Sequence, residues 1–100
     1  MAIQVQQREK EGIAILDLTG PLTAGEGASA LREKLNQLMT ASHKDVILNL
    51  KGVEYIDSTG LGAMVVCYTS LRKSGGKLVL LNLNRRHIEL LILTKLSTVF

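Results

Sequence analysis

The sequence predicts an α/β fold: a mixed, mostly parallel β-sheet with an N-terminal hairpin and crossover helices, in the order ββαβαβα. Two strand-like segments at the start are separated by a short turn, which is typical of an antiparallel hairpin. Apolar runs and helical patterns then alternate, as in parallel strands joined by crossover helices. A chain of 100 residues that is 46% hydrophobic can build one core, so we expect a single domain over residues 1–100.

The predicted hairpin joins residues 3–7, where apolar residues alternate with glutamines, to an apolar strand over residues 13–19. Its half-polar first strand is expected at an edge of the sheet. Thr23 and Glu26 have the spacing of a capping box and predict the start of the first helix, which should fade near residues 40–44. The apolar stripe of this helix consists of Ala28, Leu31, Leu35, Leu38 and Met39.

Residues 45–50 and 77–83 are nearly continuous apolar runs, which predict strands buried on both faces. A helix is expected between them, over residues 58–74, followed by Gly75 or Gly76 in the left-handed conformation.

Asn84 should cap a last short helix with an apolar stripe of Ile88, Leu91 and Ile92. The tail gathers Leu96, Val99 and Phe100 for a further packed contact.

The segment YIDSTGLG, residues 55–62, lies between a predicted strand and a predicted helix. Asp57, Ser58 or Thr59 can cap this helix, because their short side chains reach the unpaired amides of its first turn. Gly60 and Gly62 leave that turn bare, although each glycine costs about 1 kcal/mol relative to alanine in a helix. Either tight packing on the sheet or access for another surface would explain them.

The helix that follows is apolar on more than one side. A stripe suited to burial consists of Leu61, Met64, Val65, Tyr68 and Leu71, and Ala63, Val66 and Cys67 add further apolar surface. A surface helix normally shows water a polar face. This helix is therefore either covered by its neighbours or a docking surface in its N-terminal half.

Motifs of catalysis are incomplete in this chain. Ile56 stands where the nucleophile elbow G-x-S-x-G requires its first glycine, and Glu26 stands where a P-loop requires lysine. Val65 likewise replaces the third glycine of G-x-G-x-x-G, and no histidine, cysteine or acid has metal-ligand spacing. The sequence therefore predicts no catalytic residue, no metal and no cofactor, with His43 and His87 as ordinary polar residues.

Charge and hydropathy exclude other classes. The net charge of +3 is scattered, without the basic, aromatic-interleaved run of a nucleic-acid-binding protein. No apolar run approaches the roughly 18 residues of a membrane span. The start lacks the pattern of a signal peptide, and Cys67 is the sole cysteine, which excludes an intrachain disulfide. A cytoplasmic protein is the expectation.

The segment YIDSTGLG after the VILNL strand, preceded by LTGPLT and followed by SGGKLVLLNL, resembles a STAS domain, and more narrowly the bacterial anti-sigma factor antagonists. The resemblance implies a non-enzymatic switch that binds an anti-sigma factor with serine kinase activity. Phosphorylation of the antagonist releases this partner, and a protein phosphatase resets the switch. On this sequence Ser58 would be the phosphoacceptor and Asp57 its acidic neighbour. Thr59 would be a second, less favoured hydroxyl, while Gly60, Leu61 and Gly62 would shape the turn and the contact helix.

Two alternative functions remain open for this sequence. STAS domains also serve as scaffold subunits of larger sensory assemblies, and Ser58 with its glycine turn could serve a small phosphate-ester- or nucleotide-binding enzyme. The resemblance departs at Thr23, where many relatives carry an acid. Relatives also usually continue beyond the position of Phe100, so exposure of Leu96, Val99 and Phe100 would favour a homodimer.

Overall fold

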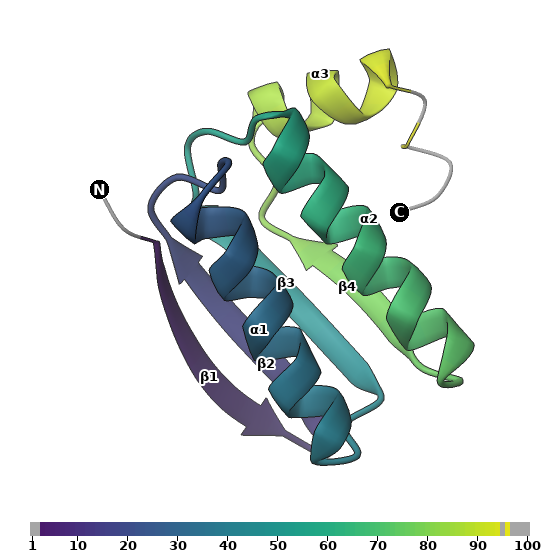
Figure 1. Cartoon of the computed structure of the whole chain (residues 1–100). Helices are drawn as coiled ribbons and strands as arrows, with labels where there is room; N and C mark the ends of the chain where they lie inside the picture. Colours follow the sequence, from purple (N-terminus) through teal and green to yellow (C-terminus); the bar gives the residue numbers. More distant parts are fainter. Residues whose placement is uncertain (1–2, 95, 97–100) are drawn as a thin grey trace.

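The computed structural model describes residues 3–94 and residue 96 of the chain. It contains one four-stranded sheet in the order β1-β2-β3-β4, with three helices (Figure 1). The elements are β1 (Gln4–Lys10), β2 (Ile13–Thr19), α1 (Glu26–Thr40), β3 (Asp45–Gly52), α2 (Ser58–Lys73), β4 (Lys77–Leu81) and α3 (Arg85–Leu93). β1 pairs antiparallel with β2, whereas the β2–β3 and β3–β4 pairs are parallel. The predicted fold class and element order are confirmed.

The hairpin turn consists of two residues in the left-handed region, Glu11 at φ 55° and Gly12 at φ 82°. Turns of this kind match the right-handed twist of the strands that they join. β1 continues to Lys10, beyond the predicted end at residue 7, because its polar second half also pairs with β2. There the Arg8 guanidinium donates to the Asp17 carboxylate, with Nε 2.6 Å from Oδ2, and this bond lowers the pKa of Asp17.

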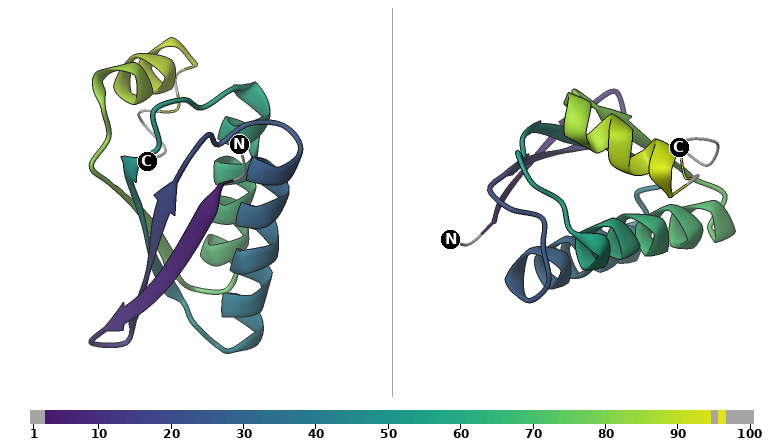
Figure 2. Two further views of the ribbon diagram at one scale, coloured as in Figure 1. Left: turned by 90° about the vertical axis from the view of Figure 1, so that its left-hand side faces the viewer. Right: turned by 90° about the horizontal axis from the view of Figure 1, so that it is seen from above.

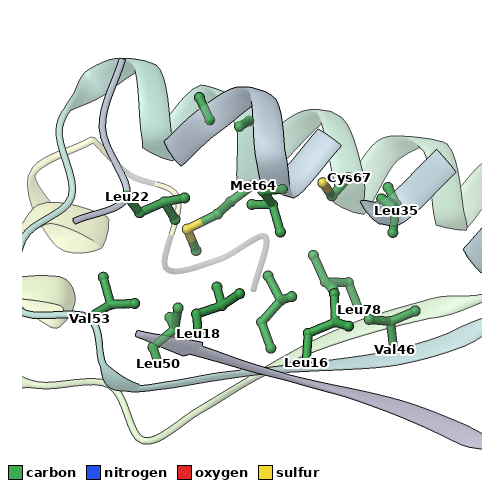
Figure 3. Close-up of a cluster of buried hydrophobic side chains, with 14 of the residues drawn as sticks. Leu16, Leu18, Leu22, Leu35, Val46, Leu50, Val53, Met64, Cys67 and Leu78 are labelled. Carbon is green, nitrogen blue, oxygen red and sulfur yellow. The ribbon is translucent and has the colours of Figure 1, made fainter. Parts of the chain in front are cut away.

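The core lies between the sheet and a layer formed by α1 and α2, which run side by side along one face (Figures 1 and 2). Figure 3 shows leucine and valine side chains of the sheet meeting Leu22, Leu35, Met64 and Cys67 from the helical side. Among the described residues, the buried hydrophobic core is aliphatic apart from the sulfur atoms of Met64 and Cys67. Burial raises the pKa of the Cys67 thiol to about 12, so this cysteine is a core side chain and a poor nucleophile.

Within the described residues, no helix covers the opposite face of the sheet, so the prediction of strands buried on both faces was wrong. Val79 and Leu81 of β4 are 51% and 42% exposed. A chain of polar contacts crosses this face: Asn49 Nδ2 donates to Asp17 Oδ1 at 2.7 Å, and Asn82 Nδ2 donates to Asn49 Oδ1 at 2.9 Å. An apolar run shows that a strand is buried on one side, but the second side depends on where the helices pack.

Strand β4 begins after a tight end of α2. Gly75 has φ 81°, which confirms it as the left-handed glycine, and the amides of Gly75 and Gly76 donate to Arg72 and Leu71. This is the Schellman arrangement, which satisfies the last carbonyls of the helix.

Helix α3 lies across the end of the sheet, near the start of α2 (Figure 1). Asn84 caps it as predicted, and its side chain accepts from the His87 amide at 2.8 Å. The predicted apolar stripe was partly wrong: Leu91 is buried, but Ile88 and Ile92 are 45% and 60% exposed. His87 takes the buried position instead, because its ring Nδ1 accepts from the Asn84 amide at 3.2 Å and completes a capping box.

Because His87 is buried, its pKa lies below the usual 6.5, an effect that the nearby Val53 carbonyl only partly offsets. The unfolded chain therefore binds a proton at this residue more readily than the folded chain. We expect the free energy of unfolding to be fully retained above pH about 6.5 and to fall as the pH drops below that value. Urea unfolding of the wild-type chain and of His87→Gln, at pH 8 and pH 5, measures this. The prediction fails if both proteins lose the same stability between the two pH values.

The predicted contacts of Val99 and Phe100 lie outside the described residues, while Leu96 packs against the core. Among the helices of the described residues, none is both long and apolar enough to cross a membrane.

Candidate functional site

The segment singled out in the sequence forms the connection from β3 to α2, at the end of the sheet where the parallel strands finish. Asp57 is the N-cap of α2, and its Oδ1 accepts from the Gly60 amide at 2.8 Å. Of the three capping candidates, the structure therefore selects Asp57. Its extended backbone, with φ −95° and ψ −178°, is the conformation usual for this position.

The other oxygen of Asp57 joins two loops. Oδ2 accepts from the Ala24 amide at 3.0 Å, across a separation of 33 residues. The bonds from the Ala24 and Gly60 amides, in that order, lower the pKa of the Asp57 carboxyl. The carboxylate is thus held ionised, and it ties the β2–α1 loop to the first turn of α2.

The hydrogen bond from the Ala24 amide to Asp57 explains why the predicted capping box at Thr23 and Glu26 was wrong. Helix α1 begins at Glu26, its N-cap is Gly25, and no side chain caps it. Because the Ala24 amide is drawn to Asp57, the chain around Thr23 stays outside the helix. Gly25, at φ 85°, turns the backbone into α1.

Leu22 holds the same two loops together through its backbone. Its amide donates to the Tyr55 carbonyl at 3.0 Å, and its carbonyl accepts from the Asp57 amide at 3.3 Å. These bonds flank an isolated parallel bridge between Leu22 and Ile56. The turn before Ser58 is therefore fixed on both sides.

Different structural reasons explain the presence of glycine at positions 60 and 62 of the turn. A Cβ atom added to Gly60 would lie 1.9 Å from the Leu22 carbonyl oxygen, so close packing requires glycine at this position. A Cβ atom added to Gly62 would meet nothing within 4 Å. Packing therefore explains Gly60, and Gly62 leaves open space on the surface of α2.

Ser58 and Thr59 are the first two residues of α2, and both are exposed. Within the part of the chain that the structure describes, neither hydroxyl has a hydrogen-bond partner. The partial positive charge of a helix N-terminus surrounds them. The Ser58 hydroxyl is therefore accessible to a second protein, in a setting that tolerates negative charge.

The buried side of α2 differs slightly from the predicted stripe. Leu61, Met64 and Leu71 are buried as predicted, while Val65 and Tyr68 are only half-buried. Burial includes a line of smaller residues, Gly60, Ala63 and Cys67. Most of the apolar surface of α2 is thus covered by neighbours, although Val66 remains 49% exposed. Leu61 supports the turn from inside and does not face solvent.

Each histidine has a hydrogen-bond partner other than Ser58. His43 Nε2 pairs with the Glu9 carboxylate at the hairpin, and His87 Nδ1 accepts from the Asn84 amide. Among the described residues, no group of three or more histidines, cysteines and acids could hold a metal ion.

A groove beside the turn was not anticipated from the sequence. It has a volume of about 420 Å³ and is lined by Thr19, Gly20, Pro21, Gly52, Glu54 and Tyr55. The loops on its two sides are widely separated in sequence, so periodicity and local motifs contain no signal for it. The only signal in the sequence was the aromatic Tyr55 at the start of the YIDSTGLG segment.

The chain is similar to known proteins in both sequence and fold. The STAS domain family model matches residues 4–100. The chain is 36% identical over 99 residues to a Bacillus subtilis protein named anti-sigma-B factor antagonist, covering 99% of this chain and 89% of that protein.

Solved structures share the fold. An anti-sigma factor antagonist from Mycobacterium paratuberculosis superposes with a TM-score of 0.80 at 23% identity, covering 99% of this chain and 83% of that one. The Bacillus cell fate determinant SpoIIAA in its phosphorylated form gives a TM-score of 0.75 at 18% identity, covering 95% and 86%. At these identities the likeness concerns the fold alone.

Proposed function

The chain belongs to the STAS domain family, and on that basis we propose that it is an anti-sigma factor antagonist whose binding is controlled at Ser58. In this proposal the unphosphorylated chain binds an anti-sigma factor that is also a serine kinase, and so frees a sigma factor for transcription. Phosphorylation of Ser58 ends the binding, and a phosphatase restores it. The chain itself performs no catalysis. The observation that carries the proposal is the exposed Ser58 hydroxyl on a rigid turn at a helix N-terminus.

The physical effect of phosphorylation would be local. A phosphate group adds roughly −1.5 to −2 charges and three strong acceptor oxygens. At the start of α2 the unpaired amides and the helix dipole favour such a group, so the antagonist can keep its fold. The likeness of this chain to a phosphorylated SpoIIAA supports this view, because that protein retains the same fold. The cost then falls on the partner, through like charge and lost contact at the interface.

The other residues of the turn would have supporting roles. Asp57 would fix the position of Ser58 through its bonds to Gly60 and Ala24. Gly62 would let the partner approach the backbone of α2 closely, since the space above it is open. Thr59 would lie at the rim of the contact.

A phosphorylation assay tests the assignment. The chain is incubated with ATP and each anti-sigma factor kinase of the source organism, and the modified residue is located by mass spectrometry. We expect one phosphate on Ser58 in the wild-type chain and in Thr59→Ala, and none in Ser58→Ala. Phosphate on Thr59 in the Ser58→Ala variant would reassign the acceptor, and absence of phosphate with every kinase would reject the proposed switch.

A further inference from the structure

Tyr55 is an exposed aromatic side chain that lies three residues before Ser58. It is 56% exposed, and within the described residues its side chain has no hydrogen-bond or ion-pair partner. Its backbone is nevertheless fixed, because its carbonyl accepts from the Leu22 amide and the next residue, Ile56, is buried. A tyrosine held in this way can be covered by another protein at a small cost in conformational entropy.

Tyr55 is one of the residues that line the groove described above. The lining also includes the end of β2 at Thr19 and the loop through Gly20 and Pro21. The Gly20 amide donates to the Gly52 carbonyl at 3.0 Å, so the two chain segments that line the groove are joined by a backbone hydrogen bond. The lining is mostly apolar, and the exposed Glu54 is its one side chain that carries a charge at neutral pH. A preformed, mostly apolar hollow beside a rigid aromatic ring has the character of an interface hot spot.

We propose that this groove receives an apolar side chain of the same anti-sigma factor that Ser58 controls, with Tyr55 as the anchor of the contact. The inference rests on the proposed function, which it extends by dividing recognition between two adjacent places. The phosphorylation state of Ser58 determines whether the partner can bind. The Tyr55 groove supplies affinity and selects the partner.

Two observations favour this occupant. The groove is adjacent to the Ser58 turn, because Tyr55 lines it three residues before Ser58 and Leu22 bonds to the backbone of both Tyr55 and Asp57. A protein that covers Ser58 can therefore reach the groove as well. Charge gives the second argument: with Glu54 at the rim, the favoured segment carries a lysine or arginine next to its apolar residue.

The test compares Tyr55→Ala with Val79→Ala. Val79 is exposed to a similar degree, 51%, but lies on the open face of the sheet, so it controls for loss of any exposed apolar side chain. Both variants should keep the wild-type melting temperature within a few degrees, because exposed side chains contribute little to stability. Tyr55→Phe keeps the ring and tests whether the hydroxyl matters.

Binding of the unphosphorylated proteins to the cognate anti-sigma factor is measured by calorimetry, and phosphorylation of Ser58 by steady-state kinetics. We expect Tyr55→Ala to weaken binding about 30-fold and to raise KM with little change in kcat. Tyr55→Phe and Val79→Ala should stay within about threefold of wild type. A small change in kcat separates lost docking from a displaced Ser58.

The outcomes distinguish the inference from the function on which it rests. If Ser58→Asp abolishes binding but Tyr55→Ala binds like wild type, the groove has no role and the switch stands. If Tyr55→Ala and Val79→Ala weaken binding equally, the effect is not specific to the groove and the inference is wrong. If Tyr55→Ala instead dissociates a homodimer without altering partner binding, the groove is occupied by a second copy of this chain. That outcome also overturns the inference. If no anti-sigma factor binds the wild-type chain, both proposals fail.

Discussion

Ser58→Asp is expected to lose at least about 100-fold in affinity for the anti-sigma factor, whereas Ser58→Ala should bind as tightly as the unphosphorylated wild type, with or without ATP. The reason is the position of Ser58 at an exposed helix start, where the domain tolerates a negative charge but a tightly apposed partner does not. Calorimetry or surface plasmon resonance with the cognate anti-sigma factor measures both constants. Equal affinities for the two variants would contradict the switch.

The matched control is Ser42→Asp, which makes the same chemical change at another exposed serine. Ser42 lies in the connection from α1 to β3, at the end of the sheet away from Ser58. Its φ of 66° is a conformation that aspartate accepts more readily than most residues. Ser42→Asp should bind like wild type. If it also binds poorly, the loss reflects net charge, and position at the turn is irrelevant.

The second large effect is expected at Gly60, where alanine should destabilise the fold by about 2–4 kcal/mol. The new Cβ atom would lie 1.9 Å from the Leu22 carbonyl oxygen, which is a backbone atom held by its bond from the Asp57 amide. For a domain of this size, each kcal/mol corresponds to about 4–8 °C in melting temperature. Thermal unfolding should therefore show a decrease in melting temperature of roughly 8–32 °C.

Gly62→Ala provides the matched comparison, since it makes the same substitution two residues later in the same helix. With nothing within 4 Å, alanine should raise stability by about 0.5–1 kcal/mol through its higher helix propensity. The same variant should weaken binding of the anti-sigma factor, because the methyl group fills space that the partner needs. Gains in both stability and binding would show that Gly62 is not part of the interface.

Where local chemistry determines the structure, the sequence predicted it well. The strand over residues 13–19, the left-handed Gly75 and the cap at Asn84 were each indicated by residues next to the feature itself. The same applies to the turn around Asp57, whose short acid, hydroxyls and glycines fit a helix start. These features depend on steric and capping preferences that act within a few residues.

Features set by distant residues were missed. The cap at Thr23 did not form because Asp57, far along the chain, takes the Ala24 amide. The open face of β4 follows from the placement of both long helices on the other side. His87 was predicted to be an ordinary polar residue, but it is buried, and its burial depends on how α3 packs against the rest of the domain. The different reasons for glycine at positions 60 and 62 likewise could not be predicted without knowing where Leu22 lies.

The Glu11–Gly12 turn has a practical use for anyone who wants to follow this protein in real time. It closes the hairpin at the end of β2 where Ile13 lies, while the groove and the Ser58 turn lie beyond Thr19 at the other end of that strand. A fluorescent dye or a small tag grafted there would sit far from the docking partner, so a live reporter of the switch can be built without obstructing it.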